Sequence, residues 1–107
     1  MKEYGIDIDD ILLMKRVFAS FPEINNVILF GSRAMGRQKS GSDFDFALDS
    51  DNMTFEDLLD LDSKLEELGF LYKIDLLLLK AINDPDLLNH IHRVGKLFYS
   101  KNEILNA

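Results

Sequence analysis

The sequence predicts an α/β (α+β) fold in which helices pack against a mixed central β-sheet. Segments with the periodicity of amphipathic helices alternate with short apolar or period-two segments typical of strands. The predicted order is helix, strand, strand, helix, strand, helix, strand, and the direct link between the first two strands needs no crossover. The 107 residues, 47% of them hydrophobic, fit one domain (residues 1–107) with its own core.

The first half of the chain predicts one helix and two strands. Apolar residues recur at helical spacing from Asp7 to Phe21, and Pro22 lies just beyond the end of this helix. The run Asn26–Phe30 is almost entirely apolar and stops at a glycine, which predicts a buried strand. Phenylalanines alternate with aspartates from residue 43 onward, so residues 43–49 predict a second strand.

The second half predicts two helices and two strands. Thr54 can cap a helix over residues 55–68, which a glycine closes. The leucine-rich run 72–79 predicts a strand, although four leucines could equally prolong a helix. The glycine before it and the helix start at Asp84–Pro85 favour the strand. Residues 96–100 predict a last, short strand.

Composition excludes several kinds of protein. The chain has 19 acidic and 12 basic residues, which gives a net charge of -7 and disfavours a broad nucleic-acid surface. The absence of cysteine excludes a disulfide scaffold, a thiolate zinc site and a cysteine nucleophile. No apolar run reaches the length of about 18–20 residues that a membrane span needs, and the first residues lack a signal-peptide pattern. We expect a cytoplasmic protein that does not engage a membrane.

Gly31 and Ser32 follow directly on the first predicted strand and precede a short helical segment. Backbone N–H groups at such a helix start point outward and can bind phosphate oxygens, and glycine lets the backbone approach closely. The Ser32 hydroxyl adds one more donor. A tight turn without a ligand is the alternative.

Asp43 and Asp45 lie two residues apart on the second predicted strand, so they point to the same face. Phe44 and Phe46 fix the opposite face in the core, and the acidic register cannot slip. Mg²⁺ prefers such oxygen ligands together with substrate phosphates. The alternative is a solvated strand face.

Asp75 interrupts the apolar run of the third predicted strand, where a lone carboxylate is costly unless it is paired or binds a metal. If that strand neighbours the strand of Asp43 and Asp45, three carboxylates converge beside the glycine turn. This is the composition of a two-metal site for phosphoryl or nucleotidyl transfer. The two histidines, His90 and His92, diverge on a helix and make a poor metal pair.

The run Gly31-Ser32, ten residues and then Asp43-Phe44-Asp45-Phe46, with a later Asp75, resembles the signature of the polymerase-beta-type nucleotidyltransferase superfamily. The fuller text GSRAMG…GSDFDFAL, followed by KIDLL, resembles the minimal nucleotidyltransferase (MNT) family in particular. The likeness extends from residue 27 to about residue 99 and implies a polymerase-beta-like fold.

The resemblance also implies roles for matching residues. Asp43, Asp45 and Asp75 would be catalytic metal ligands for two Mg²⁺ ions, the first two shared by both ions. Gly31 and Ser32 would bind the phosphates of ATP, the substrate. Arg33, which follows the pair, would hold the turn or touch phosphate.

Many MNT proteins are antitoxins paired with a HEPN-domain toxin. The resemblance therefore implies transfer of AMP from ATP to a tyrosine of such a partner. The chain has hardly a residue beyond the catalytic core, so the acceptor surface must come from a second copy, a partner protein or the acceptor itself. Two alternatives remain: an antitoxin that neutralises its partner by binding alone, and a small-molecule nucleotidyltransferase whose homodimer completes the pocket.

Overall fold

The computed structural model describes residues 1–103 and 105. Two strands, β1 and β2, form a small N-terminal hairpin, and four strands, β3 to β6, form the main sheet. The elements in chain order are β1 (Lys2–Glu3), β2 (Ile6–Asp7), α1 (Ile8–Ala19), β3 (Ile24–Phe30), α2 (Gly31–Ala34), β4 (Phe44–Ser50), α3 (Phe55–Glu66), β5 (Ile74–Leu78), the 3₁₀ turn η1 (Leu79–Ala81), α4 (Pro85–Val94) and β6 (Lys96–Ser100).

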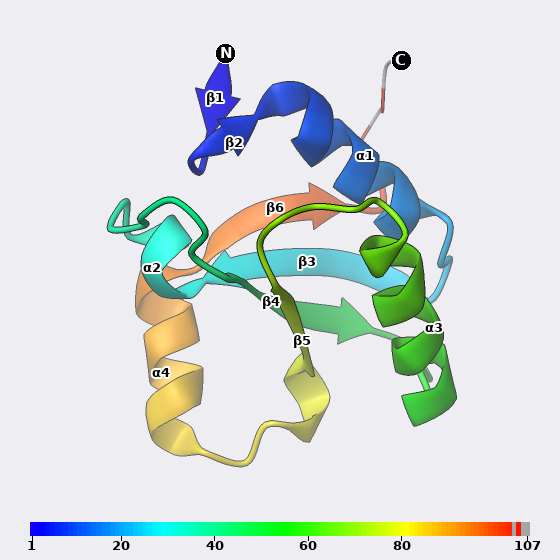
Figure 1. Ribbon diagram of the computed structural model, residues 1–107. Helices are drawn as coiled ribbons and strands as arrows, with labels where there is room; N and C mark the ends of the chain where they lie inside the picture. The colour runs from blue at the N-terminus through cyan, green and yellow to red at the C-terminus, as the bar shows by residue number, and fades with distance from the viewer. Residues whose placement is uncertain (104, 106–107) are drawn as a thin grey trace.

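The main sheet has the strand order β5-β4-β3-β6. Strand β3 pairs antiparallel with β4 and β6, whereas β4 pairs parallel with β5. The helices α1 and α3 lie on one side of this sheet and α4 on the other (Figure 1). The predicted α/β fold with a mixed sheet is therefore confirmed, with each predicted strand and helix present.

Strand β4 fixes the register of the whole sheet. Its alternate residues Phe44, Phe46 and Leu48 are fully buried under α1 and α3. The Phe18 ring of α1 meets the Phe46 ring edge to face, with centroids 5.3 Å apart. A slip of one residue would expose all three β4 side chains, at about 1.5–3 kcal/mol each. The residues between them, including Asp45, are therefore held on the opposite face.

The helix starts follow the predicted capping signals. Thr54 and Asp57 form a reciprocal capping box at the start of α3. Asp84 caps α4, and Pro85 occupies its first turn, where proline is favoured. These local signals fix where each helix leaves the sheet.

The structure adds three elements, β1, β2 and η1, to those that the sequence predicts. The hairpin of β1 and β2 precedes α1, and its turn places Tyr4 and Gly5 at positive φ. Two-residue strands are too short to show a period-two pattern, so the sequence did not predict them. Gly31–Ala34 forms the short helix α2, which begins two residues earlier than the helical segment expected after Ser32. The leucine run forms β5 and then turns into η1, which settles the strand-or-helix alternative in favour of the strand.

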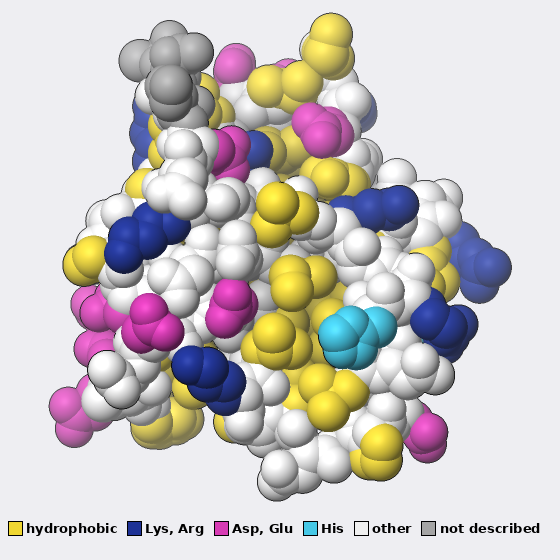
Figure 2. Space-filling view, turned by 180° about the vertical axis from the view of Figure 1, so that it is seen from behind, with side chains coloured by type: hydrophobic (Ala, Val, Ile, Leu, Met, Phe, Trp, Pro, Cys, Tyr) yellow, Lys and Arg dark blue, Asp and Glu magenta, His cyan; other side chains and the backbone are white. Residues whose placement is uncertain are grey.

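Helix α4 covers only part of its face of the sheet. A hollow of about 410 Å³ beside it is lined by Ile28, Leu79, Ile91 and Leu97, and hydrophobic side chains gather at the centre of this back face (Figure 2). Within the part of the chain that the structure describes, no helix is both long enough and apolar enough to cross a membrane.

Candidate active site

The turn after β3 is built around Gly31. Phe30 ends the strand in an extended conformation, and Gly31 begins α2 with φ of +75°. A Cβ atom at Gly31 would collide with the carboxylate of Asp45. Because L residues rarely adopt this φ and any side chain would meet Asp45, the position requires glycine. Ser32 is half-buried in the same turn.

The sheet brings two of the three predicted carboxylates together. Asp45 on β4 lies opposite Phe30 of β3 on one side and opposite Asp75 of β5 on the other. Paired residues of adjacent strands lie about 5 Å apart and point to the same face, so Asp45 and Asp75 are direct neighbours. Asp43 immediately precedes the first residue of β4 and is exposed.

The charge of Asp45 is poorly stabilised by its surroundings. Burial, then the carboxylates of Asp75 and Asp43, raise the pKa of Asp45 above its usual range, while His90 acts in the opposite direction. Like charges held this close favour a cation between them. The donor set, hard carboxylate oxygens beside a backbone turn, suits Mg²⁺ rather than a softer metal.

The carboxylates do not form a complete set of ligands for one metal ion. Among the described residues, no three acidic or histidine side chains are grouped as ligands of one ion. The Asp75 carboxylate lies 3.4 Å from the ammonium of Lys73, and both side chains are well exposed. An exposed ion pair contributes about 0–1 kcal/mol, so Asp75 can exchange Lys73 for a cation at little cost.

Arg33 is a buried residue of the turn, and its side chain bonds to other segments of the chain. Its side chain is only 3% exposed. Its guanidinium donates to the carbonyl oxygen of Ser42 at 2.9 and 2.7 Å and to that of Tyr4 at 2.6 Å. It also stacks over the rings of Phe44 at 4.3 Å and Tyr72 at 5.2 Å. Of the two roles that the sequence left open for Arg33, these contacts favour holding the turn.

His90, which the sequence indicated only as a poor metal ligand, is a neighbour of the site. Its ring meets the Phe30 ring edge to face at 6.1 Å, and Phe30 is the cross-strand partner of Asp45. The available signal was its spacing, since His90 comes three residues after Leu87 and four before Val94, both of which pack on this face of the sheet. His92, in contrast, is exposed.

A family model for polymerase beta nucleotidyltransferases matches residues 13–104, nearly the whole chain. The chain belongs to this family. The match spans the glycine turn, all three carboxylates and every strand of the main sheet. A comparison with curated proteins finds no match.

Solved structures with the same fold include proteins of toxin–antitoxin complexes. A chain of a toxin–antitoxin complex with AMP-PNP has a TM-score of 0.67 at 24% identity, covering 91% of this chain and 76% of that one. A mutant of the toxin–antitoxin MntA-HpeT gives 0.66 at 23%, covering 91% and 75%. The tri-AMPylated Shewanella oneidensis HEPN toxin in complex with MNT antitoxin gives 0.59 at 21%, covering 85% and 72%. These likenesses confirm the polymerase-beta-like fold.

Proposed function

We propose that this nucleotidyltransferase transfers AMP from ATP, with Mg²⁺, to a tyrosine hydroxyl of a HEPN-domain toxin in the cytoplasm, and so acts as its antitoxin. The observation that carries the proposal is the row formed by Phe30, Asp45 and Asp75 across three strands, with Gly31 against Asp45. This geometry puts the Gly31 turn, whose backbone could bind phosphate, beside paired carboxylates, and this supports nucleotidyl transfer.

Two of the similar structures support the choice of nucleotide and acceptor. One toxin–antitoxin complex was solved with AMP-PNP, an ATP analogue. In another, a HEPN toxin in complex with MNT antitoxin carries AMP groups. The acidic charge of -7 also favours a protein acceptor over a nucleic acid.

In the proposed mechanism, the backbone of Gly31 and the hydroxyl of Ser32 hold the phosphates of ATP. Asp45 and Asp75, with Asp43, would hold Mg²⁺, for which we propose two ions. Mg²⁺ bound there would neutralise charge on the phosphates and would lower the pKa of the attacking hydroxyl. The acceptor oxygen forms a bond to the α-phosphorus as the bond to pyrophosphate breaks, and the hydroxyl proton passes to solvent water. Burial of Phe44 and Phe46 in the core keeps the Asp45 side chain on the opposite face of β4, where the reaction would take place.

The test is transfer of AMP to a purified HEPN-domain protein from the same genome, followed by mass spectrometry. We expect the mass of AMP to appear on a tyrosine with the wild type and to be absent with Asp45→Asn or Asp43→Asn. The control is Asp49→Asn, on the same strand face but hydrogen-bonded to Asn26 at 2.9 Å. Equal modification by Asp45→Asn and the wild type would overturn the metal assignment.

A second candidate is an antitoxin that acts by binding alone. It is favoured by the Lys73–Asp75 ion pair and by the absence of a ready metal cage among the described residues. This candidate predicts that Asp43, Asp45 and Asp75 can all be changed to asparagine without loss of neutralisation in cells. The catalytic proposal predicts that the triple variant no longer neutralises the toxin. A small-molecule acceptor would instead show transfer with no protein partner present.

A further inference from the structure

A groove runs between α3 and β5, on the face of the sheet opposite the Asp45 side chain, and Asp75 borders it at the edge of the sheet. Its volume is about 410 Å³, and its walls include Leu58 and Leu59 of α3, Tyr72, Leu76 and the carboxyl-bearing Asp75. Leu59 is 54% exposed, which leaves an apolar side chain of the groove open to solvent. The groove therefore joins apolar surface to a residue of the proposed reaction centre.

One wall of the groove is formed by β5, which is an edge strand of the main sheet. Strand β5 is the last strand on its side, and the described residues place no further strand beyond it. The N–H of Phe44 donates to the carbonyl oxygen of Lys73 at 2.9 Å, so Lys73 and every second residue after it face β4. The residues between them, Ile74, Leu76 and Leu78, turn their N–H and C=O groups outward. Such an edge is a template for an added strand.

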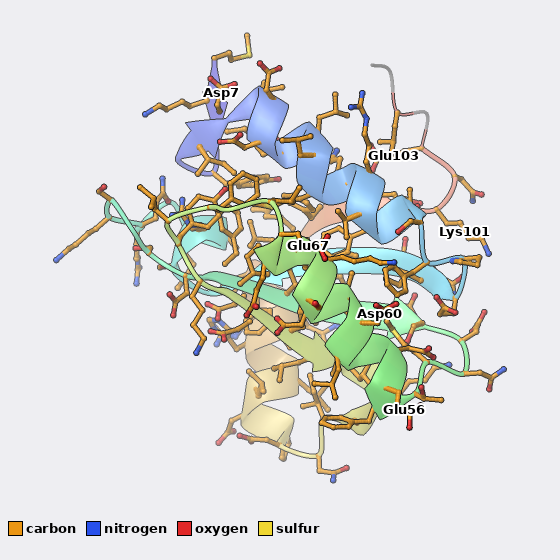
Figure 3. The ribbon with its side chains drawn as sticks, turned by 45° about the vertical axis from the view of Figure 1, so that its right-hand side comes forward. Asp7, Glu56, Asp60, Glu67, Lys101 and Glu103 are labelled. Carbon is orange, nitrogen blue, oxygen red and sulfur yellow. The ribbon has the colours of Figure 1, made fainter. Side chains whose placement is uncertain are left out.

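The charge of the groove selects the kind of segment that can bind. Its lining includes Asp62, Glu66 and Asp75 against one cation, Lys73, which already pairs with Asp75. The outer side of α3 is acidic as well, where Glu56, Asp60 and Glu67 lie along the helix (Figure 3). A basic segment is attracted to this surface, whereas a nucleic acid or an acidic peptide is repelled.

We propose that an extended segment of the protein acceptor, with apolar residues in alternation and Lys or Arg among them, adds to β5 as a further strand. This proposal rests on the proposed transfer to a protein. Phe30, Asp45 and Asp75 form one row across the sheet and point to one face. The residue of the added strand opposite Asp75 continues that row, about 5 Å from Asp75. A tyrosine there is presented on the face that carries the carboxylates.

The test is selection of binders from a displayed library of random twelve-residue peptides against the wild-type chain. We expect the selected peptides to show alternating apolar residues and a basic net charge. On binding, amide hydrogen exchange should slow at Ile74, Leu76 and Leu78. Peptides with neither feature, a selection without binders, or unchanged exchange at these amides would overturn the proposal.

Two matched pairs of variants locate the binding. Leu59 lies inside the groove, so Leu59→Lys should weaken peptide binding at least about tenfold. Phe55 is 69% exposed on the same helix but lies outside the groove, so Phe55→Lys should leave peptide binding within about twofold of the wild type. Glu66→Lys should weaken binding more than its neighbour Glu67→Lys does, because only Glu66 lines the groove. Equal effects within either pair would contradict docking at this site.

Asp45→Asn separates docking from chemistry. The variant should bind the selected peptides as the wild type does, because Asp45 lies one strand away from the groove edge, while it loses AMP transfer. If the proposed transfer is wrong but peptides still dock on β5, the docking proposal stands alone. If transfer occurs and the β5 amides stay unprotected, only the docking proposal fails.

Discussion

Gly31 lies directly against the carboxylate of Asp45, with no room for a side chain between them. The two residues come from different strands, β3 and β4, and are joined through the pairing of Phe30 with Asp45. The turn that we propose binds phosphate and the carboxylate that would hold Mg²⁺ are therefore one steric unit. A side chain introduced at residue 31 must therefore displace the Asp45 carboxylate.

We expect Gly31→Ala to lower AMP transfer at least about a hundredfold, because the new methyl group displaces Asp45. The fold should lose about 1–3 kcal/mol, from the positive φ and the collision together. Gly36→Ala is the matched control: Gly36 also has a positive φ of +70° but faces open space. It should cost about 1 kcal/mol and leave transfer nearly unchanged. Transfer assays and urea denaturation of both variants check this, and equal losses of activity would contradict the steric coupling.

Asp45→Asn should stabilise the protein when Mg²⁺ is removed with a chelator. Burial, with Asp75 and Asp43, raises the pKa of Asp45 in the folded protein above its ordinary 3.8. The folded state then holds the proton at pH values where the unfolded chain has lost it, so stability falls as pH rises from about 3.8 through the raised pKa. The asparagine variant lacks this loss. Urea denaturation between pH 4 and 8 should show a higher free energy of unfolding near pH 7 for the variant.

Adding Mg²⁺ should reverse that order. A ligand that binds only the folded state stabilises it, so the wild type should gain stability with Mg²⁺ and Asp45→Asn should not. The exposed Glu67→Gln serves as the control, with a change within about 0.5 kcal/mol under either condition. A wild type that is indifferent to Mg²⁺ would contradict the assignment of Asp45 as a metal ligand.

Arg33→Lys should destabilise the fold by about 2 kcal/mol. Lysine cannot reproduce the fork that donates to Ser42 and Tyr4, nor the stacking on Phe44. The exposed Arg37→Lys should stay within about 0.5 kcal/mol. Urea denaturation measures both variants. Weaker ATP binding by Arg33→Lys with unchanged stability would show that Arg33 touches phosphate instead.

The sequence predicted the parts of the site that depend on local pattern. The alternation around Asp45 fixed its face, because Phe44 and Phe46 had to be buried. The glycine turn was predicted from its place after an apolar strand. That Asp45 and Asp75 are neighbours could be predicted only on the condition that their strands pair, because the pattern of one sequence does not reveal the order of strands in a sheet. It follows only from the observed parallel pairing of β4 with β5.

Contacts between distant segments could not be predicted in the same way. Arg33 meets Tyr4 and Tyr72 only because the N-terminal hairpin and the loop before β5 fold over the turn. The groove along β5 depends equally on how α3 lies against the sheet edge. Neither arrangement leaves a periodic signal, since both are set by packing across the whole fold.

His90→Ala should lower AMP transfer about tenfold, equivalent to about 1.4 kcal/mol of transition-state stabilisation. His90 packs on Phe30, the cross-strand partner of Asp45, and its charge favours the ionised form of Asp45. Its loss therefore disturbs both the position and the charge of that carboxylate. His92→Ala, an exposed change two residues along α4, should leave transfer within about twofold. Because a purely structural role would act through stability, transfer and urea denaturation are measured together. If His90→Ala loses stability and transfer in the same measure as Ile91→Ala, a packing variant of the same helix, His90 acts only as part of the α4 packing.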